Sequence, residues 1–285
     1  MATFCPPLDV PNMPYSQRQL VIVQPDQIVN AARIALANSQ SQSGNIDWMD
    51  VTGRIAKTIL RINPLPNVVM DLGIEALKAW TKARESGLDV LQIGHSEALA
   101  LQFPPGHPRE KTMYVAHPAV PTMYYTAAMF HRMTFEHKFS EAIQLLMSLG
   151  ASRIMVEHVH GWSKEFTTNI SAGFPKGEEN LSGGGKTSAS SKLLFEASLK
   201  NKKSPALPDG LVWYMHEPTW QAVAKGRLEY GMQHFSMNVV YEDDFGVNAG
   251  LKVRTQKVGF ELGGTFEDHM ATIWNIHGEF ASENN

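Results

Sequence analysis

The stretch ASRIMVEHVHGWSKEFTTNIS, residues 151–171, alternates between two kinds of side chain over almost its whole length. A period of two is typical of a β-strand with one buried face. At about 3.3 Å per residue this strand would far exceed an ordinary strand of five or six residues. We therefore expect it to bend, to break at Gly161, or to project from its sheet. Its more apolar face carries Ile154, Val156, His158, His160, Trp162, Lys164, Phe166, Thr168 and Ile170.

A second alternating stretch, Lys192 to Lys200, follows after a segment rich in glycine and serine. We expect the two stretches to pair as a long amphipathic β-hairpin over residues 152–200, with ENLSGGGKTSASSK, residues 179–192, at its tip. Each strand of a membrane-spanning β-hairpin needs about 9 to 11 residues of alternating character, and the two stretches are long enough for this. The residues predicted to act in a membrane or an assembly are Trp162, Phe166, Ile170, Phe174, Leu193 and Phe195.

The tip contains Gly185-Lys186-Thr187, which resembles the end of a phosphate-binding loop. That loop needs a further glycine at residue 180, because its backbone must turn tightly around the phosphates. Residue 180 is Asn180, and the preceding segment is broken by Gly173 and Pro175 rather than forming a buried strand. The sequence therefore predicts a turn-rich link and no nucleotide site.

Periodicity in the rest of the chain indicates an α+β protein, with an N-terminal helical region over residues 1–90 and an antiparallel-sheet domain over residues 91–285. No strand-helix-strand repeat with the composition of a parallel sheet is evident. The predicted helices cover residues 26–36, 47–62, 67–85, 124–148 and 218–229. The predicted strands outside the long hairpin cover residues 98–103, 112–117, 235–241, 247–262 and 266–280.

Composition narrows the functional classes. The 285 residues are 43% hydrophobic and can fill a core, and the formal net charge of −3 with a pI near 6.4 argues against nucleic acid as a partner. The single cysteine, Cys5, excludes an intrachain disulfide, and neither a signal peptide nor an apolar run of 18 residues is present. We expect a cytoplasmic protein that associates with a membrane only when active.

Histidines offer the best alternative chemistry. His158 and His160 lie two apart on the predicted strand and would project from one face, as the first ligands of a metal site do. Other residues that could complete the site, His216, Glu217 and His234, stand at no spacing that ties them to this pair. His137 is expected to be solvated on a helix, and Trp213, Tyr214 and Trp220 are expected in a core rather than on a ligand.

No complete catalytic motif appears, so the sequence favours a non-enzymatic protein without a cofactor. We expect an effector or assembly protein that acts through the hairpin, by self-association, by binding a protein partner, or by inserting into a membrane as a pore. Lys164 opposes insertion, because a lipid-facing charge near the middle of a bilayer costs about 2–4 kcal/mol. The alternatives are a soluble partner-binding α+β protein and a metal-dependent hydrolase that uses His158 and His160.

Overall fold

A computed structural model describes residues 7–40, 53, 67–162, 193–200 and 204–281. The chain divides into two compact units, residues 1–131 with 246–268 and residues 132–245 with 269–285. This division does not coincide with the boundary that the sequence suggested at residue 90. Both units combine helices with a sheet in which antiparallel pairing dominates, which confirms the α+β class.

The first unit contains a four-stranded sheet in the order β2-β1-β3-β4. Its strands are β1 (Leu20–Gln24), β2 (Leu91–Gly94), β3 (Met113–Ala116) and β4 (Tyr124–Thr126). Strands β1 and β2 are parallel, and the other pairs are antiparallel. Helices separate β1 from β2 along the chain, so these two strands form one strand-helix-strand unit, which was not predicted from the sequence.

Helices complete the first unit. The expected helices at 26–36 and 67–85 are confirmed as α2 (Asp26–Gln40) and α4 (Asn67–Glu85), whereas the predicted helix at 47–62 lies outside the described residues apart from residue 53. The remaining helices are the 3-10 helix η1 (Val10–Asn12), α1 (Tyr15–Arg18), α5 (His95–Ala98) and α9 (Ala249–Val258).

Three predictions for this unit were wrong. The segment 247–262 was expected as a strand, but Asn248 caps helix α9 by accepting from the backbone N–H groups of Gly250 and Leu251. The expected hairpin between 98–103 and 112–117 does not form, because β3 pairs instead with β1 and β4. The helix expected from residue 124 begins only at Phe130, after the short strand β4.

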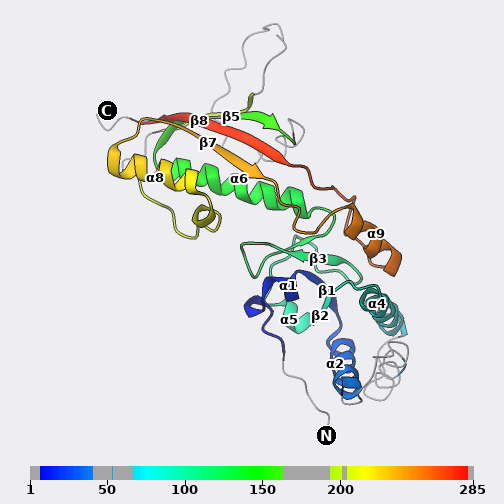
Figure 1. Cartoon of the computed structure of the whole chain (residues 1–285). Helices are drawn as coiled ribbons and strands as arrows, with labels where there is room; N and C mark the ends of the chain where they lie inside the picture. The colour runs from blue at the N-terminus through cyan, green and yellow to red at the C-terminus, as the bar shows by residue number, and fades with distance from the viewer. Residues whose placement is uncertain (1–6, 41–52, 54–66, 163–192, 201–203, 282–285) are drawn as a thin grey trace. The chain divides into compact units, whose positions relative to one another are not determined.

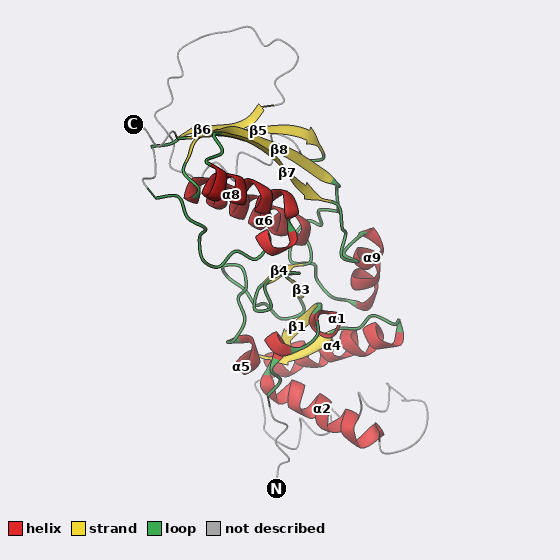
Figure 2. Ribbon diagram, turned by 60° about the vertical axis from the view of Figure 1, so that its left-hand side comes forward, coloured by secondary structure: helices red, strands yellow, loops and turns green. Residues whose placement is uncertain are grey.

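The second unit is built on an antiparallel sheet in the order β6-β5-β8-β7. Its strands are β5 (Ala151–His160), β6 (Leu193–Ser198), β7 (His234–Tyr241) and β8 (Thr272–Phe280). Helices α6 (Phe130–Ser148) and α8 (Pro218–Tyr230) lie on the same face of this sheet in both views (Figures 1 and 2). A 3-10 helix, η3 (Tyr214–His216), precedes α8.

The core of the second unit forms between α6 and the sheet. Alternate residues of β8 are buried, and Trp274 at 0% exposure meets the edges of Phe135 and Phe139 with ring centroids 4.8 and 5.0 Å apart. A side chain at Gly278 would overlap the carbonyl group of Arg153 on β5, so the close approach of these strands requires glycine. Strand β7 confirms the strand predicted at 235–241, and β8 confirms the C-terminal part of the strand predicted at 266–280.

Candidate functional site

The two arms of the predicted hairpin pair at one edge of the second sheet. Strand β5 pairs antiparallel with β6, with Ile154 opposite Ala197 and Val156 opposite Phe195, and the register shifts after Val156. On its other side β5 pairs with β8. The base of the hairpin is thus part of the sheet, and β6 is its outermost strand.

The residues predicted to act in the hairpin have different fates. Trp162 packs against Phe135 at 5.5 Å and Tyr241 at 5.9 Å between ring centroids, and its carbonyl oxygen accepts from Trp274 Nε1 at 2.9 Å. These contacts anchor Trp162, at the base of the hairpin, in the core. Leu193 is partly exposed, at 37%. The backbone of Phe195 lies in β6, whereas Phe166, Ile170 and Phe174 lie outside the described residues.

The pair His158 and His160 does not assemble a metal site in the part of the chain that the structure describes, where no group of three metal-ligating side chains comes together. The Nε2 atom of His158 lies 2.9 Å from the carbonyl oxygen of Gly161. The register with β8 shifts between His158 and His160, so the pair is not a regular i, i+2 pair of one strand face. Gly161 has a φ of +85°, and β5 ends just before it.

Strand β7, at the opposite edge, is covered by side chains from the helices. Trp220 Nε1 on α8 donates to the carbonyl oxygen of Asn238 at 3.1 Å, and Lys138 Nζ on α6 donates to that of Val240 at 2.7 Å. Carbonyl groups two residues apart point to the same side of a strand. Both bonds come from helices rather than from the neighbouring strand β8, so they occupy two carbonyl groups on the outer side of β7.

Strand β6 differs from β7 in what lies on its outer side. Among the described residues no strand pairs with that side of β6, and its sequence LLFEAS, like that of β7, contains neither lysine nor proline, the residues that usually block a sheet edge. Its one charge, Glu196, accepts from Arg153 Nε at 2.9 Å and from Nη2 at 2.7 Å. The described edge of β6 is therefore largely apolar, and its only charge is neutralised.

A loop before α8 is fixed to α6 by one buried carboxylate. Glu141 accepts three backbone N–H groups, from Val212 at 2.9 Å and from Trp213 and Tyr214 at 2.8 Å. Hydrogen bonds to a charged acceptor are stronger than neutral ones. Trp213 and Trp220 are buried, which confirms the expectation that they belong to the core, whereas Tyr214 is partly exposed.

The expected solvation of His137 was wrong. Its Nδ1 atom lies 2.9 Å from Trp213 Nε1, which can only donate, so Nδ1 is the acceptor. Burial lowers the pKa of His137, and the nearby Glu141 carboxylate acts in the opposite direction. Lys138 pairs with Glu217 and places its ammonium 5.2 Å from the centre of the Trp213 ring. These contacts give the loop a structural attachment.

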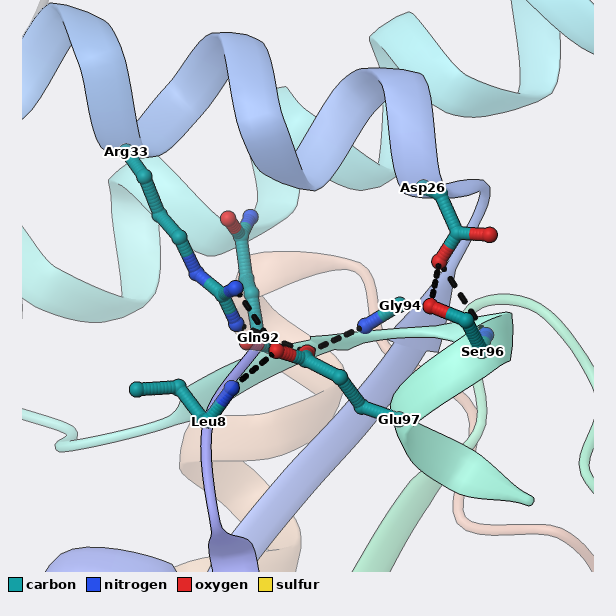
Figure 3. Close-up of polar contacts among 7 residues, drawn as sticks. All are labelled: Leu8, Asp26, Arg33, Gln92, Gly94, Ser96 and Glu97. Carbon is teal, nitrogen blue, oxygen red and sulfur yellow. Dashed lines mark hydrogen bonds and ion pairs between the residues drawn. The ribbon is translucent and has the colours of Figure 1, made fainter. Parts of the chain in front are cut away.

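A second polar cluster joins three segments of the first unit (Figure 3). Glu97 on α5 forms a two-armed ion pair with Arg33 on α2, at 2.7 and 2.8 Å, and also accepts the backbone N–H groups of Leu8 at 2.6 Å and Gly94 at 2.9 Å. Arg33 further donates to the carbonyl oxygen of Gln92. Burial raises the pKa of Glu97, but these hydrogen bonds and the charge of Arg33 outweigh it, so the pKa is lowered.

This cluster was not predicted from the sequence. Glycine is among the residues found at helix N-caps, and a glutamate three residues later can accept the backbone N–H of the cap residue. Gly94 and Glu97 fit this pattern after the apolar residues of β2. The cluster joins helices α2 and α5 to strand β2, which is a structural role.

Comparison with known proteins finds no matching family model, no matching curated protein and no matching solved structure. In the described part of the chain no helix has both the length and the apolar character to cross a membrane.

Proposed function

We propose that this chain is a non-enzymatic assembly protein, and that the edge strand β6 of its β5–β6 hairpin pairs with β6 of a second copy. The observation that carries the proposal is the contrast between the two edges of the second sheet. Trp220 and Lys138 occupy carbonyl groups of β7, whereas β6 has no pairing strand on its outer side among the described residues. An open apolar edge is a template for another strand.

The charge of β6 does not oppose a second copy as the occupant. Two antiparallel β6 strands related by a two-fold axis would bring their Glu196 side chains near each other, and like charges across a strand pair are destabilising. Arg153 already neutralises Glu196 through two hydrogen bonds. An antiparallel edge can therefore meet its own copy without a charge penalty, and a closed dimer results because β7 is covered.

The anchored base supports a role for the hairpin in assembly rather than as a free arm. Trp162 packs on Phe135 and Tyr241, and Trp274 donates to its carbonyl oxygen, so the sheet positions the hairpin where β5 ends. Membrane insertion that extends the alternating pattern back to Trp162 would need these contacts to break. The hairpin is therefore proposed to act from a fixed base.

The test is sedimentation velocity of the intact chain over a wide concentration range, with Leu193→Lys as the edge variant and Val253→Lys as its matched control. Both substitutions place a lysine at an apolar side chain that is already exposed, at 37% and 62% respectively, and Val253 lies on α9 in the first unit. We expect concentration-dependent dimers that persist in Val253→Lys and disappear in Leu193→Lys. A chain that stays monomeric throughout, or one that leaks dye from liposomes as a monomer, would overturn the proposal.

A further inference from the structure

Two glutamines in the core of the first unit have polar atoms without hydrogen-bond partners in the described part of the chain. Gln24, the last residue of β1, is 0% exposed, and both its Oε1 and Nε2 atoms lack a partner. Gln92 on β2 has an unpartnered Nε2 atom. Buried side-chain amides in native proteins are almost always hydrogen-bonded, to protein or to a bound molecule, so two such groups together need an explanation.

The strand register places both amides on one face of the sheet. Gln92 lies opposite Ile22, and Gln24 lies opposite Gly94, so Gln24 and Gln92 are diagonal neighbours on parallel strands. A Cβ atom added to Gly94 would lie 3.2 Å from Cγ of Asp26 and overlap its Oδ1. Since Asp26 begins α2, this face of the sheet is the one that meets the first turn of that helix.

The carboxyl end of β1 is the end of a parallel strand at which α/β proteins bind ligands, although they do so where the strand order reverses. In the described sheet β1 has one parallel neighbour, β2, and one antiparallel neighbour, β3, so the buried amides and not the strand order point to a ligand. Gln24 is the last residue of β1 and directly precedes Pro25 and the 15-residue helix α2, and β2 ends at Gly94 beside it. The unpartnered amide of Gln24 thus lies at the start of this helix, on the face that meets it.

The chemistry of the groups selects the ligand. A side-chain amide offers one acceptor and two donors, and another carboxamide presents the reciprocal set in the same plane. A carboxylate would lack the N–H that Gln24 Oε1 requires. The Asp26 carboxylate at the start of α2, whose Oδ1 accepts from Ser96 N and Oγ at 3.1 and 2.9 Å (Figure 3), would also repel an acid, because like charges repel.

We propose that Gln24 and Gln92 form a binding site for a small carboxamide at the start of α2, with Asp26 excluding the corresponding acid. The ligand's N–H group would donate to Gln24 Oε1, and its carbonyl oxygen would accept from the two Nε2 groups. This inference concerns the first unit and does not depend on the assembly proposed for β6.

The experiment compares acetamide and nicotinamide with acetate and nicotinate as probes, using calorimetry and thermal unfolding of the intact chain. We expect saturable binding and a rise in Tm with at least one amide and with neither acid. Gln24→Leu and Gln92→Leu should abolish the rise, while Gln144→Leu, at an exposed glutamine on α6, should retain it.

Gln24→Met guards against a trivial loss of folding in the leucine variants. It keeps the length of the side chain and removes both its donors and its acceptor, so amide binding should be lost although the fold, checked by circular dichroism, is retained. The inference is overturned if no amide binds the wild-type chain, if acids bind as well as amides, or if folded Gln24→Leu and Gln24→Met bind as the wild type does. If Gln24→Leu raises the Tm and the wild-type chain binds no amide probe, the side chains of Gln24 and Gln92 are only an unfavourable feature of the core.

Discussion

Lys138 on α6 donates a hydrogen bond of 2.7 Å to the carbonyl oxygen of Val240 on β7, which lies 102 residues further along the chain. The same ammonium group pairs with Glu217, directly before α8. One buried lysine thus closes an edge of the second sheet and joins both covering helices to it. Contacts of this kind distinguish the β7 edge from β6, on whose outer side no strand pairs among the described residues.

Removing this lysine should destabilise the chain and expose a second edge. Lys138→Met leaves Glu217 without its partner, and breaking a largely buried ion pair costs about 3–5 kcal/mol. Urea unfolding measures the loss in free energy. In the double variant Lys138→Met/Glu217→Gln part of the loss should be recovered, yet both variants should form higher oligomers than the wild type. Unchanged stability in Lys138→Met would show that the contact is unimportant.

The carboxylate of Glu141 should matter more than an ordinary surface charge. Glu141→Gln weakens bonds to three backbone N–H groups, and hydrogen bonds to a charged group contribute about 1.5–3 kcal/mol each. We expect a lower free energy of unfolding and faster proteolysis near residues 211–217. Glu136→Gln on the same helix breaks only a partly exposed pair with Arg132 and should change stability by less than about 1 kcal/mol. Equal effects of the two variants would contradict this assignment.

His137 should make stability depend on pH. Because burial lowers its pKa in the folded chain, the unfolded chain binds a proton more readily. The stability that neutral, buried His137 contributes to the folded chain is therefore fully present above the ordinary histidine pKa of about 6.5. It is lost as the pH falls through that value toward the lowered pKa. Unfolding free energies measured across this range should fall less steeply in His137→Gln, which retains an acceptor for Trp213, than in the control His216→Gln. Parallel curves would refute the role of His137.

Gly94 should tolerate no side chain while Asp26 is present. Gly94→Ala forces a methyl group against Asp26 Oδ1, which Ser96 holds by two hydrogen bonds, and overpacking of this kind costs about 1–3 kcal/mol. In Gly94→Ala/Asp26→Ala the overlap is absent, so the double variant should lose less than the sum of the single losses. A double-mutant cycle in thermal unfolding measures this coupling, and strict additivity would argue against the contact.

Periodicity predicted the elements whose burial is one-sided. The alternation in residues 151–160 and 235–241 identified β5 and β7, and the apolar stripe with a final glycine identified α4. Strand β1 was missed because Leu20–Gln24 is a short run with no alternation, buried at every position. Helix α9 was read as a strand because a short segment can satisfy both periods until its cap at Asn248 is recognised.

The candidate sites were less accessible from the sequence, since they depend on contacts between distant segments. Glu141 and Trp213 are 72 residues apart, and Trp220 and Lys138 reach β7 from two different helices. No local pattern states which sheet edge is covered. The strand at Leu193–Ser198 could be predicted from its alternation, whereas the contacts of Trp220 and Lys138 with β7 could not.

Hydrogen exchange of the β6 backbone amides, measured at low and high protein concentration, tests the assembly proposal most directly. Pairing of β6 with a second copy adds main-chain hydrogen bonds on its outer side, so the amides of Leu193–Ser198 should become more protected as the concentration rises. The amides of His234–Tyr241 in β7 should not change. Protection of Leu193–Ser198 that is the same at every concentration would contradict the proposal.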